Sequence, residues 1–222
     1  LEEHIHDMVG VRLVCPFEDD VYEMVNLIKS SDLLQVCHEK DYIENPNNLF
    51  QFEGWLESYN VKQEILGMKT AEDKIRKLRL GVNYESLTSN SRSFYSLNLH
   101  QGFGENFGGM ENDSVFSTRA ISNADNEFTK ISFDWMRLQR ITPRLSLIPR
   151  LSAQYSFNSL VSGEQISIGG YGSIMGQSAS AHSGDSGYNI NLEGRYLVLP
   201  TSDKYQITAK LDHGKVFLDE NF

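Results

Sequence analysis

The chain has 222 residues, a formal net charge of −10 and a hydrophobic content of 40%. The negative charge argues against broad electrostatic binding of nucleic acid, and the lack of a run of about 18 apolar residues excludes a transmembrane helix. A transmembrane β-barrel is not excluded, because its strands alternate between apolar and polar residues. The chain begins Leu-Glu-Glu, without Met or a signal peptide, so we expect an internal part of a longer protein.

The composition changes near Pro46. Residues 1–47 contain 3 Lys/Arg and 11 Asp/Glu, whereas residues 48–222 contain 17 and 19. Of the 17 glycines, 16 lie in the second part. We therefore expect two different segments, 1–47 and 48–222.

The first segment is predicted to be a short α/β fragment. The apolar run 8–14 predicts a buried strand, and residues 33–36 predict another. Between them an acidic cluster at 18–20 favours the start of a helix. The apolar residues of this helix recur at helical spacing: Val21, Met24, Val25 and Ile28.

Residues 6–15 and 39–46 resemble RelA/SpoT-type alarmone synthetases. His6–Cys15 is similar to the D-x-x-G-x-R strand of that family. The resemblance implies that Asp7 binds Mg²⁺ and takes part in pyrophosphate transfer from ATP to GTP or GDP in the cytoplasm. The family's G-Y-x-S-x-H stretch and its second metal-binding carboxylate do not follow. A truncated GTP pyrophosphokinase is therefore an alternative function, and Mg²⁺ and nucleotides are expected only under it.

Alternation of apolar and polar residues dominates the second segment. This two-residue period is typical of strands with one apolar face. Six stretches show it: 78–85, 95–100, 131–135, 145–155, 188–196 and 205–211. Residues 51–69 are expected to add one or two strands with weaker alternation. The pattern predicts a mainly β fold with an antiparallel sheet.

Two environments explain this alternation. A soluble antiparallel β domain that binds a ligand would turn the apolar face onto a core. A transmembrane barrel would turn it to lipid and place Arg150, Glu193, Arg195 and Lys210 in a wet lumen. Tyrosines near strand ends favour the barrel, because they are typical of interfacial girdles: Tyr84, Tyr95, Tyr155, Tyr188, Tyr196 and Tyr205. A long polar connection at 102–127 and a short one at 200–203 also favour it.

Several motifs of the second segment resemble those of two-partner secretion transporters, the hemolysin-activator or ShlB/FhaC family. The matching stretches, in the family's order, are 96–104, 128–139, 162–176, 183–196 and 211–216. The resemblance implies a β-barrel in lipid of the bacterial outer membrane that exports one partner protein without ATP. It implies neither an enzyme nor a cofactor. About half of the family's strands are absent, so an incomplete barrel is expected.

The resemblance also implies a loop that folds back into the pore. Its residues here are Gly169, Gly170, Gly172, Ser173, Met175 and Gly176, and the associated wall residues are Asp185, Gly187, Tyr188, Glu193 and Arg195. Met175 stands where the family has an arginine that pairs with an acidic residue of the wall. Asp185 and Glu193 are therefore expected to lose that partner, so that transport is impaired or the loop is held in another way.

The two resemblances belong to different compartments. The simplest hypothesis is a chimera joined between Pro46 and Phe52, with the incomplete transporter barrel as its main part.

Overall fold

The computed structural model describes residues 18–30, 49–110, 114–124, 126–199 and 202–218. Within the first range, α1 (Glu18–Lys29) confirms the predicted helix. The predicted strands at 8–14 and 33–36 lie outside the described residues.

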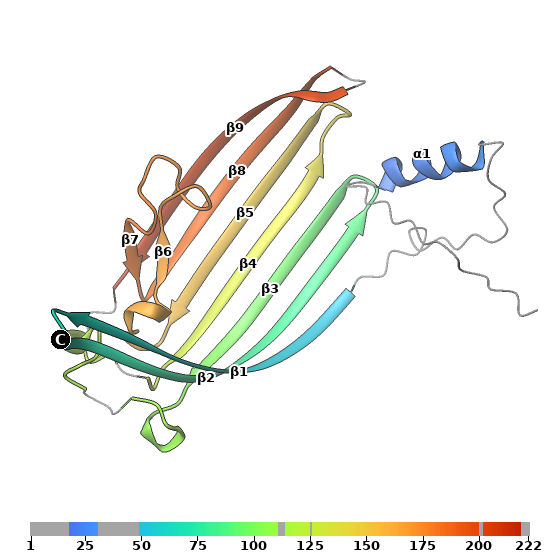
Figure 1. Ribbon diagram of the computed structural model, residues 1–222. Coiled ribbons are helices and arrows are strands. Elements are labelled where there is room, and N and C mark those ends of the chain that lie inside the picture. Colours follow the sequence, from blue (N-terminus) through green and yellow to red (C-terminus); the bar gives the residue numbers. More distant parts are fainter. Residues whose placement is uncertain (1–17, 31–48, 111–113, 125, 200–201, 219–222) are drawn as a thin grey trace, which may run out of the picture.

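The main body is a sheet of seven consecutive antiparallel strands in the order β1-β2-β3-β4-β5-β8-β9 (Figure 1). The strands are β1 (Leu49–Ile65), β2 (Met68–Thr88), β3 (Ser91–Gly102), β4 (Thr129–Arg140), β5 (Leu145–Ser156), β8 (Ser186–Leu199) and β9 (Ser202–Phe217). A separate pair is formed by β6 (Ile166–Ile168) and β7 (His182–Gly184). Each of the six predicted alternating stretches falls within one strand, and 51–69 supplies β1 and the start of β2.

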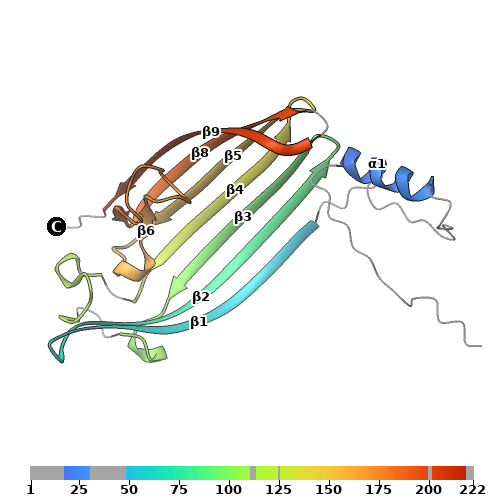
Figure 2. The ribbon, with the colours of Figure 1, turned by 45° about the horizontal axis from the view of Figure 1, so that its top comes forward.

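The sheet is curved (Figure 2). Its two faces differ in polarity. On the convex face Leu80, Leu97 and Leu99 lie on neighbouring strands and remain 49%, 49% and 42% exposed. On the concave face His100 pairs with Lys130, and Lys77 lies two residues along β2 from Arg79, which pairs with His100; all three of Lys77, His100 and Lys130 are no more than 8% exposed. This arrangement is the reverse of a soluble domain, in which burial of apolar surface drives folding.

An aromatic row crosses four strands on the convex face. Phe50, Tyr84, Tyr95 and Trp135 are cross-strand neighbours in β1, β2, β3 and β4. Their successive ring centroids lie 4.5, 5.7 and 6.4 Å apart. Tyr84 and Tyr95, expected to contribute to a girdle, therefore lie at one level of the sheet, as an interfacial band requires.

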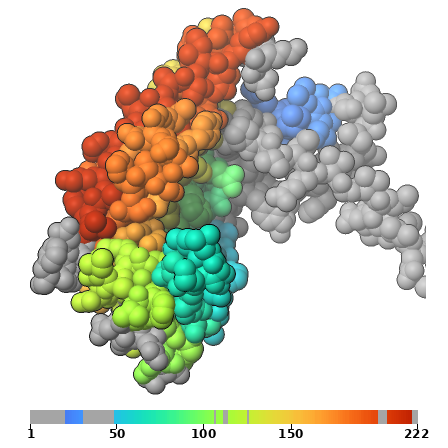
Figure 3. All heavy atoms as spheres, turned by 60° about the vertical axis from the view of Figure 1, so that its left-hand side comes forward, coloured from blue at the N-terminus to red at the C-terminus, as the bar shows by residue number. Residues whose placement is uncertain are grey.

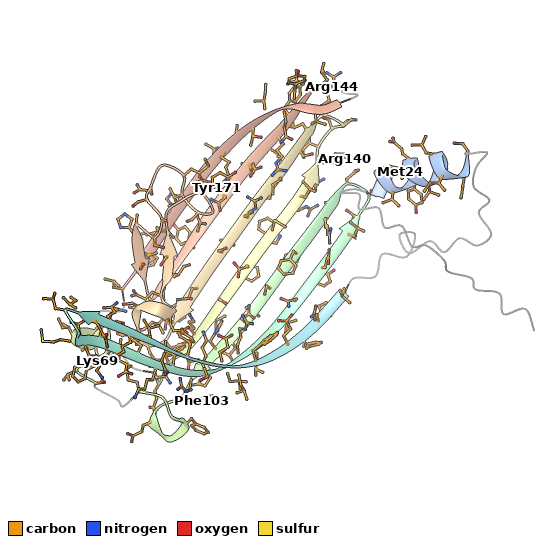
Figure 4. The ribbon with its side chains drawn as sticks, viewed as in Figure 1. Met24, Lys69, Phe103, Arg140, Arg144 and Tyr171 are labelled. Carbon is orange, nitrogen blue, oxygen red and sulfur yellow. The ribbon has the colours of Figure 1, made fainter. Side chains whose placement is uncertain are left out.

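The two ends of the strands have unequal connections. Arg140 and Arg144 mark the end with tight turns, whereas Lys69 and Phe103 mark the opposite end, where the long connections lie (Figure 4). At this loop end the β1–β2 hairpin continues beyond the last residue that β2 pairs with β3, Lys77. The outer half of β2 instead bonds the β3–β4 connection, with Phe103 N donating to Arg76 O at 2.8 Å and Glu72 N to Phe116 O at 2.7 Å. These bonds explain why β2 begins well before the predicted stretch.

The small hydrophobic core of the described residues lies at this loop end, not between layers. Ile75, Met110, Ala124 and Val161 form it, and Tyr59 packs against it. Its members come from β1, β2 and the two long connections, so the core fastens those connections to the sheet. No helix of the described ranges has both the length and the apolar character needed to cross a membrane.

Gly102 is required where β3 meets the β3–β4 connection. A Cβ at this position would lie 2.1 Å from Asn126 O and 2.6 Å from the Phe128 ring. We expect Gly102→Ala to destabilise the folded sheet by about 1–3 kcal/mol, as overpacking does. Heat-modifiable gel mobility would show this as a lower temperature for loss of the folded band. Gly172→Ala is the matched control, because a Cβ there has nothing within 4 Å; an equal shift in both variants would contradict the expectation.

Candidate functional site

The candidate site is the concave face together with the connection between β6 and β7, residues 169–181, which we call the inner loop. Glycines allow its reversals: Gly169, Gly170 and Gly176 have φ values of 117°, 87° and 92°, a region that favours glycine. Gly170 N donates to Gln177 O at 3.1 Å and closes the loop on itself.

The inner loop lies against β8 and β9 on the concave side, with Tyr171 over these strands (Figure 4). Asn191 Nδ2 donates to Ser173 O at 2.7 Å, and Met175 N donates to Asp212 Oδ2 at 3.1 Å. The Lys210 ammonium lies 5.1 Å from the centroid of the Tyr171 ring. The space-filling view shows the orange loop packed against the red C-terminal strands (Figure 3).

Asp185 and Glu193 do not pair with the residue at position 175, but each has other cationic partners, as expected if the loop is held in another way. The fully buried Asp185 forms an ion pair with Arg119 of the β3–β4 connection. Glu193 pairs with Arg195 at 2.5 Å and with Arg150 at 3.3 Å. Arginines of β5, β8 and the β3–β4 connection therefore replace the partner that Met175 does not supply.

The remaining predicted wall residues are divided between the two faces. Gly187 lies on the concave side, where a Cβ would be 2.7 Å from Lys215 O and 3.1 Å from Ile166, so it lets β6 approach the sheet. Tyr188 lies on the opposite face, with its hydroxyl 3.2 Å from His213 Nε2. Tyr188 is therefore not brought to the inner loop, and its place fits the outer aromatic surface.

A buried charge cluster around Glu164 escaped the sequence reasoning. Glu164 lies in the 3₁₀ turn Ser162–Glu164, and its carboxylate is 2.7 Å from Lys77 Nζ and 2.8 Å from Lys130 Nζ. The Tyr59 hydroxyl donates to the same carboxylate, and Lys77 also reaches Glu57 at 3.2 Å. The signal was present in two matched motifs, one containing Lys130 and the other Glu164, but nothing in the sequence paired them.

The cluster makes the loop end sensitive to acid. Burial raises the pKa of the Glu164 carboxyl, but Lys130, Lys77 and Tyr59 outweigh this and hold it below its ordinary 4.5. A depressed folded-state pKa adds stability that is complete above the unfolded-state pKa and is lost as the pH falls through the folded-state value. We expect the folded band to be lost at a lower temperature at pH 3 than at pH 7, and Glu164→Gln to reduce the difference. An unchanged difference in Glu164→Gln would contradict this assignment.

The structure does not test the predicted Mg²⁺ ligand, and it shows no metal site among the residues it describes. Asp7 lies outside the described residues. Within the described part of the chain, no three His, Cys, Asp or Glu side chains gather as metal ligands would.

Comparison with known proteins finds similarity both to two-partner secretion transporters and to a GTP pyrophosphokinase. The family model of the haemolysin secretion/activation proteins ShlB/FhaC/HecB matches residues 26–221. The solved structure of CdiB from Escherichia coli superposes with a TM-score of 0.64 at 20% identity, over 78% of this chain and 32% of that chain. The chain therefore spans about a third of CdiB, and the open sheet corresponds to part of such a barrel.

A second similarity is short. GTP pyrophosphokinase YwaC of Bacillus subtilis (strain 168) is 46% identical over 46 residues, which are 21% of this chain and 22% of that protein. The matched family and CdiB are transporters, not enzymes.

Proposed function

Because the chain belongs to the ShlB/FhaC/HecB family of haemolysin secretion/activation proteins, which are proteins of the bacterial outer membrane, we propose that it forms part of a pore that exports one partner protein. The observation that carries the proposal is the reversed polarity of the sheet. Apolar side chains cover the convex face, polar and charged ones line the concave face, and the inner loop occupies that lining.

We propose that the convex face contacts outer-membrane lipid. Exposed leucines beside a row of aromatic rings match the apolar band and girdle of transmembrane barrels. The alternative, a soluble β domain with a binding role, would leave this apolar surface in water.

The concave face would then contact the exported chain. Its Ser, Asn and charged side chains can hydrogen-bond the backbone of an extended polypeptide without holding it through large apolar contacts. The inner loop rests on this face through a few polar contacts, so it must move for a polypeptide to pass. The inner-loop residues and Asp185, Gly187 and Glu193 are the proposed transport site, and no nucleotide or metal takes part.

Membrane insertion and pore formation test this proposal together. The full chain, expressed with an export signal, should fractionate with the outer membrane and show heat-modifiable gel mobility. In planar lipid bilayers it should give conductance steps. Recovery as a monomer from the aqueous phase without detergent would overturn the proposal in favour of the soluble domain.

The YwaC similarity supports a second proposal for residues 1–47. We infer that they derive from a cytoplasmic GTP pyrophosphokinase and that the chain is a chimera joined between residues 46 and 52. The family match begins at residue 26, ahead of this join, and therefore counts against its position. One uninterrupted long DNA read across codons 40–60 tests the join, because a broken reading frame would show two proteins. Formation of (p)ppGpp from ATP and GTP by the purified chain would instead support the enzyme.

A further inference from the structure

The inner loop is flanked by two short segments, which we call its roots. Both roots form hydrogen bonds with the β3–β4 connection, which we call the outer connection. The first root, residues 160–165, precedes β6, and the second is Asp185, directly after β7. These bonds come from Thr118 and Arg119 in the outer connection. We propose that Arg119 is the positioning residue of the inner loop, in place of a cation at the loop tip.

Arg119 contacts both roots through one guanidinium nitrogen. Its Nη1 donates to Leu160 O at 2.6 Å and also to the Asp185 carboxylate. The Asp185 side chain is fully buried and that of Arg119 is only 14% exposed. A charged hydrogen bond in such a place is stronger than one in water. Arg119 therefore draws together the two points where the inner loop leaves and rejoins the sheet.

Asp185 completes the junction from the other side. Its Oδ1 accepts from Leu160 N at 2.9 Å and from Gln165 Nε2 at 3.1 Å. One carboxylate thus holds the first root at two further positions. If Arg119 is removed, this buried carboxylate loses its cation, which is costly even when other hydrogen bonds remain.

Thr118 connects the same junction to the sheet. Its hydroxyl donates to Asp73 Oδ2 at 2.8 Å and accepts from Ser162 N at 3.1 Å. Its own N donates to Asp73 Oδ1 at 3.0 Å. Asp73 is a fully buried residue of β2. Its bonds to Thr118 therefore fix the position of the outer connection on the sheet, and this connection in turn bonds both roots.

The loop tip is held more weakly than the roots. Met175 contributes its backbone N to Asp212 in an exposed contact and leaves its side chain 47% exposed. Asn191 supplies an uncharged hydrogen bond to Ser173 O. Lys210 Nζ also donates to Tyr171 O at 3.4 Å, in an exposed contact. Since solvent weakens the exposed contacts and neutral hydrogen bonds are roughly half as strong as charged ones, the roots determine where the loop lies.

A cysteine beneath the loop reports its position. Asn189 is 7% exposed and pairs in register with Gly214, next to which Ile174 of the inner loop lies. The test uses the full chain with Cys15→Ser, Cys37→Ser and Asn189→Cys in outer membranes, labelled with a membrane-impermeant maleimide. The variants are Arg119→Ala and Arg119→Lys, with Arg144→Ala, an exposed residue at the tight-turn end, as the control.

We expect Arg119→Ala to raise the labelling rate of the thiol introduced by Asn189→Cys about tenfold or more, because loss of a charged hydrogen bond shifts an equilibrium by that order. Arg119→Lys keeps a cation beside Asp185 and should label at an intermediate rate. Arg144→Ala should label like the parent. Heat-modifiable mobility identifies the folded variants. If Arg119→Ala does not fold, the labelling rate of Arg119→Lys is compared with that of the parent instead. Parental labelling rates in the folded Arg119 variants would overturn the proposal.

This inference rests on the proposed function only in treating the inner loop as the transport loop. Labelling needs no exported partner, so a chain that inserts but exports nothing can still pass or fail this test. Conversely, failure to reach the outer membrane would count against the proposed function alone, and the same labelling of the chain refolded in detergent would still decide the role of Arg119.

Discussion

Glu164→Ala is expected to destabilise the folded sheet by about 3–5 kcal/mol, the usual cost of removing one partner from a buried charge cluster. The Lys77 and Lys130 side chains are 8% and 7% exposed, and each places its ammonium within 2.8 Å of the Glu164 carboxylate. Without that carboxylate, Lys130 keeps only neutral oxygen partners, Gln154 Oε1 at 3.1 Å and the backbone oxygen of residue 164 at 2.6 Å. Urea titration of the chain folded in lipid vesicles would measure the loss.

Glu85→Ala is the matched control for that measurement. Glu85 pairs with Arg92 at 2.5 Å, but the two side chains are 35% and 53% exposed. Solvent screens such a pair, so its loss should cost no more than about 1 kcal/mol. Similar losses in the two variants would show that Glu164 does not tie the loop end together.

Leu97→Arg is expected to prevent stable insertion, whereas Ser96→Arg should be tolerated. Leu97 lies on the convex face, and an arginine facing lipid near the middle of the bilayer costs about 2–4 kcal/mol. Ser96 is the adjacent residue on the concave face, in register with Asn83 and Asp134. An arginine there would meet a carboxylate and water.

Outer-membrane fractionation and heat-modifiable mobility of the two variants provide the measurement. The substitutions lie at adjacent positions of the same strand and give both variants the same net charge. If Ser96→Arg were the more damaging change, the assignment of the two faces would be wrong.

The strands could be predicted from the sequence because their signal is local. The alternation around Leu80, Leu97 and Ile190 depends only on neighbouring residues, since successive side chains of a strand point to opposite faces. The same local signal located α1, where apolar residues recur at helical spacing beyond an acidic start. Of the six tyrosines expected to form a girdle, Tyr84 and Tyr95 lie in the row with Phe50 and Trp135, and the girdle itself stays a prediction.

The site could be predicted only in part, because its decisive contacts join distant segments. Glu164 meets Lys77 across 87 positions of the chain, and Arg119 meets Asp185 across 66. A sequence gives no register for loops, so Met175 in place of the arginine predicted the loss of that partner but not which cation replaces it at Asp185. Physically, a buried carboxylate must find a cation or donors somewhere, and the β3–β4 connection supplies them.

The number of strands limits how the sheet can be closed. Seven consecutive antiparallel strands make β1 and β9, the two edges, run in the same direction. A second copy in the same membrane orientation would therefore meet β9 with a parallel β1 and create a seam of different hydrogen-bond geometry. A barrel whose neighbours are antiparallel throughout has an even total, so whatever completes this one must contribute an odd number of strands. Parity thus favours a complement that differs from the sheet over a symmetric pair of copies.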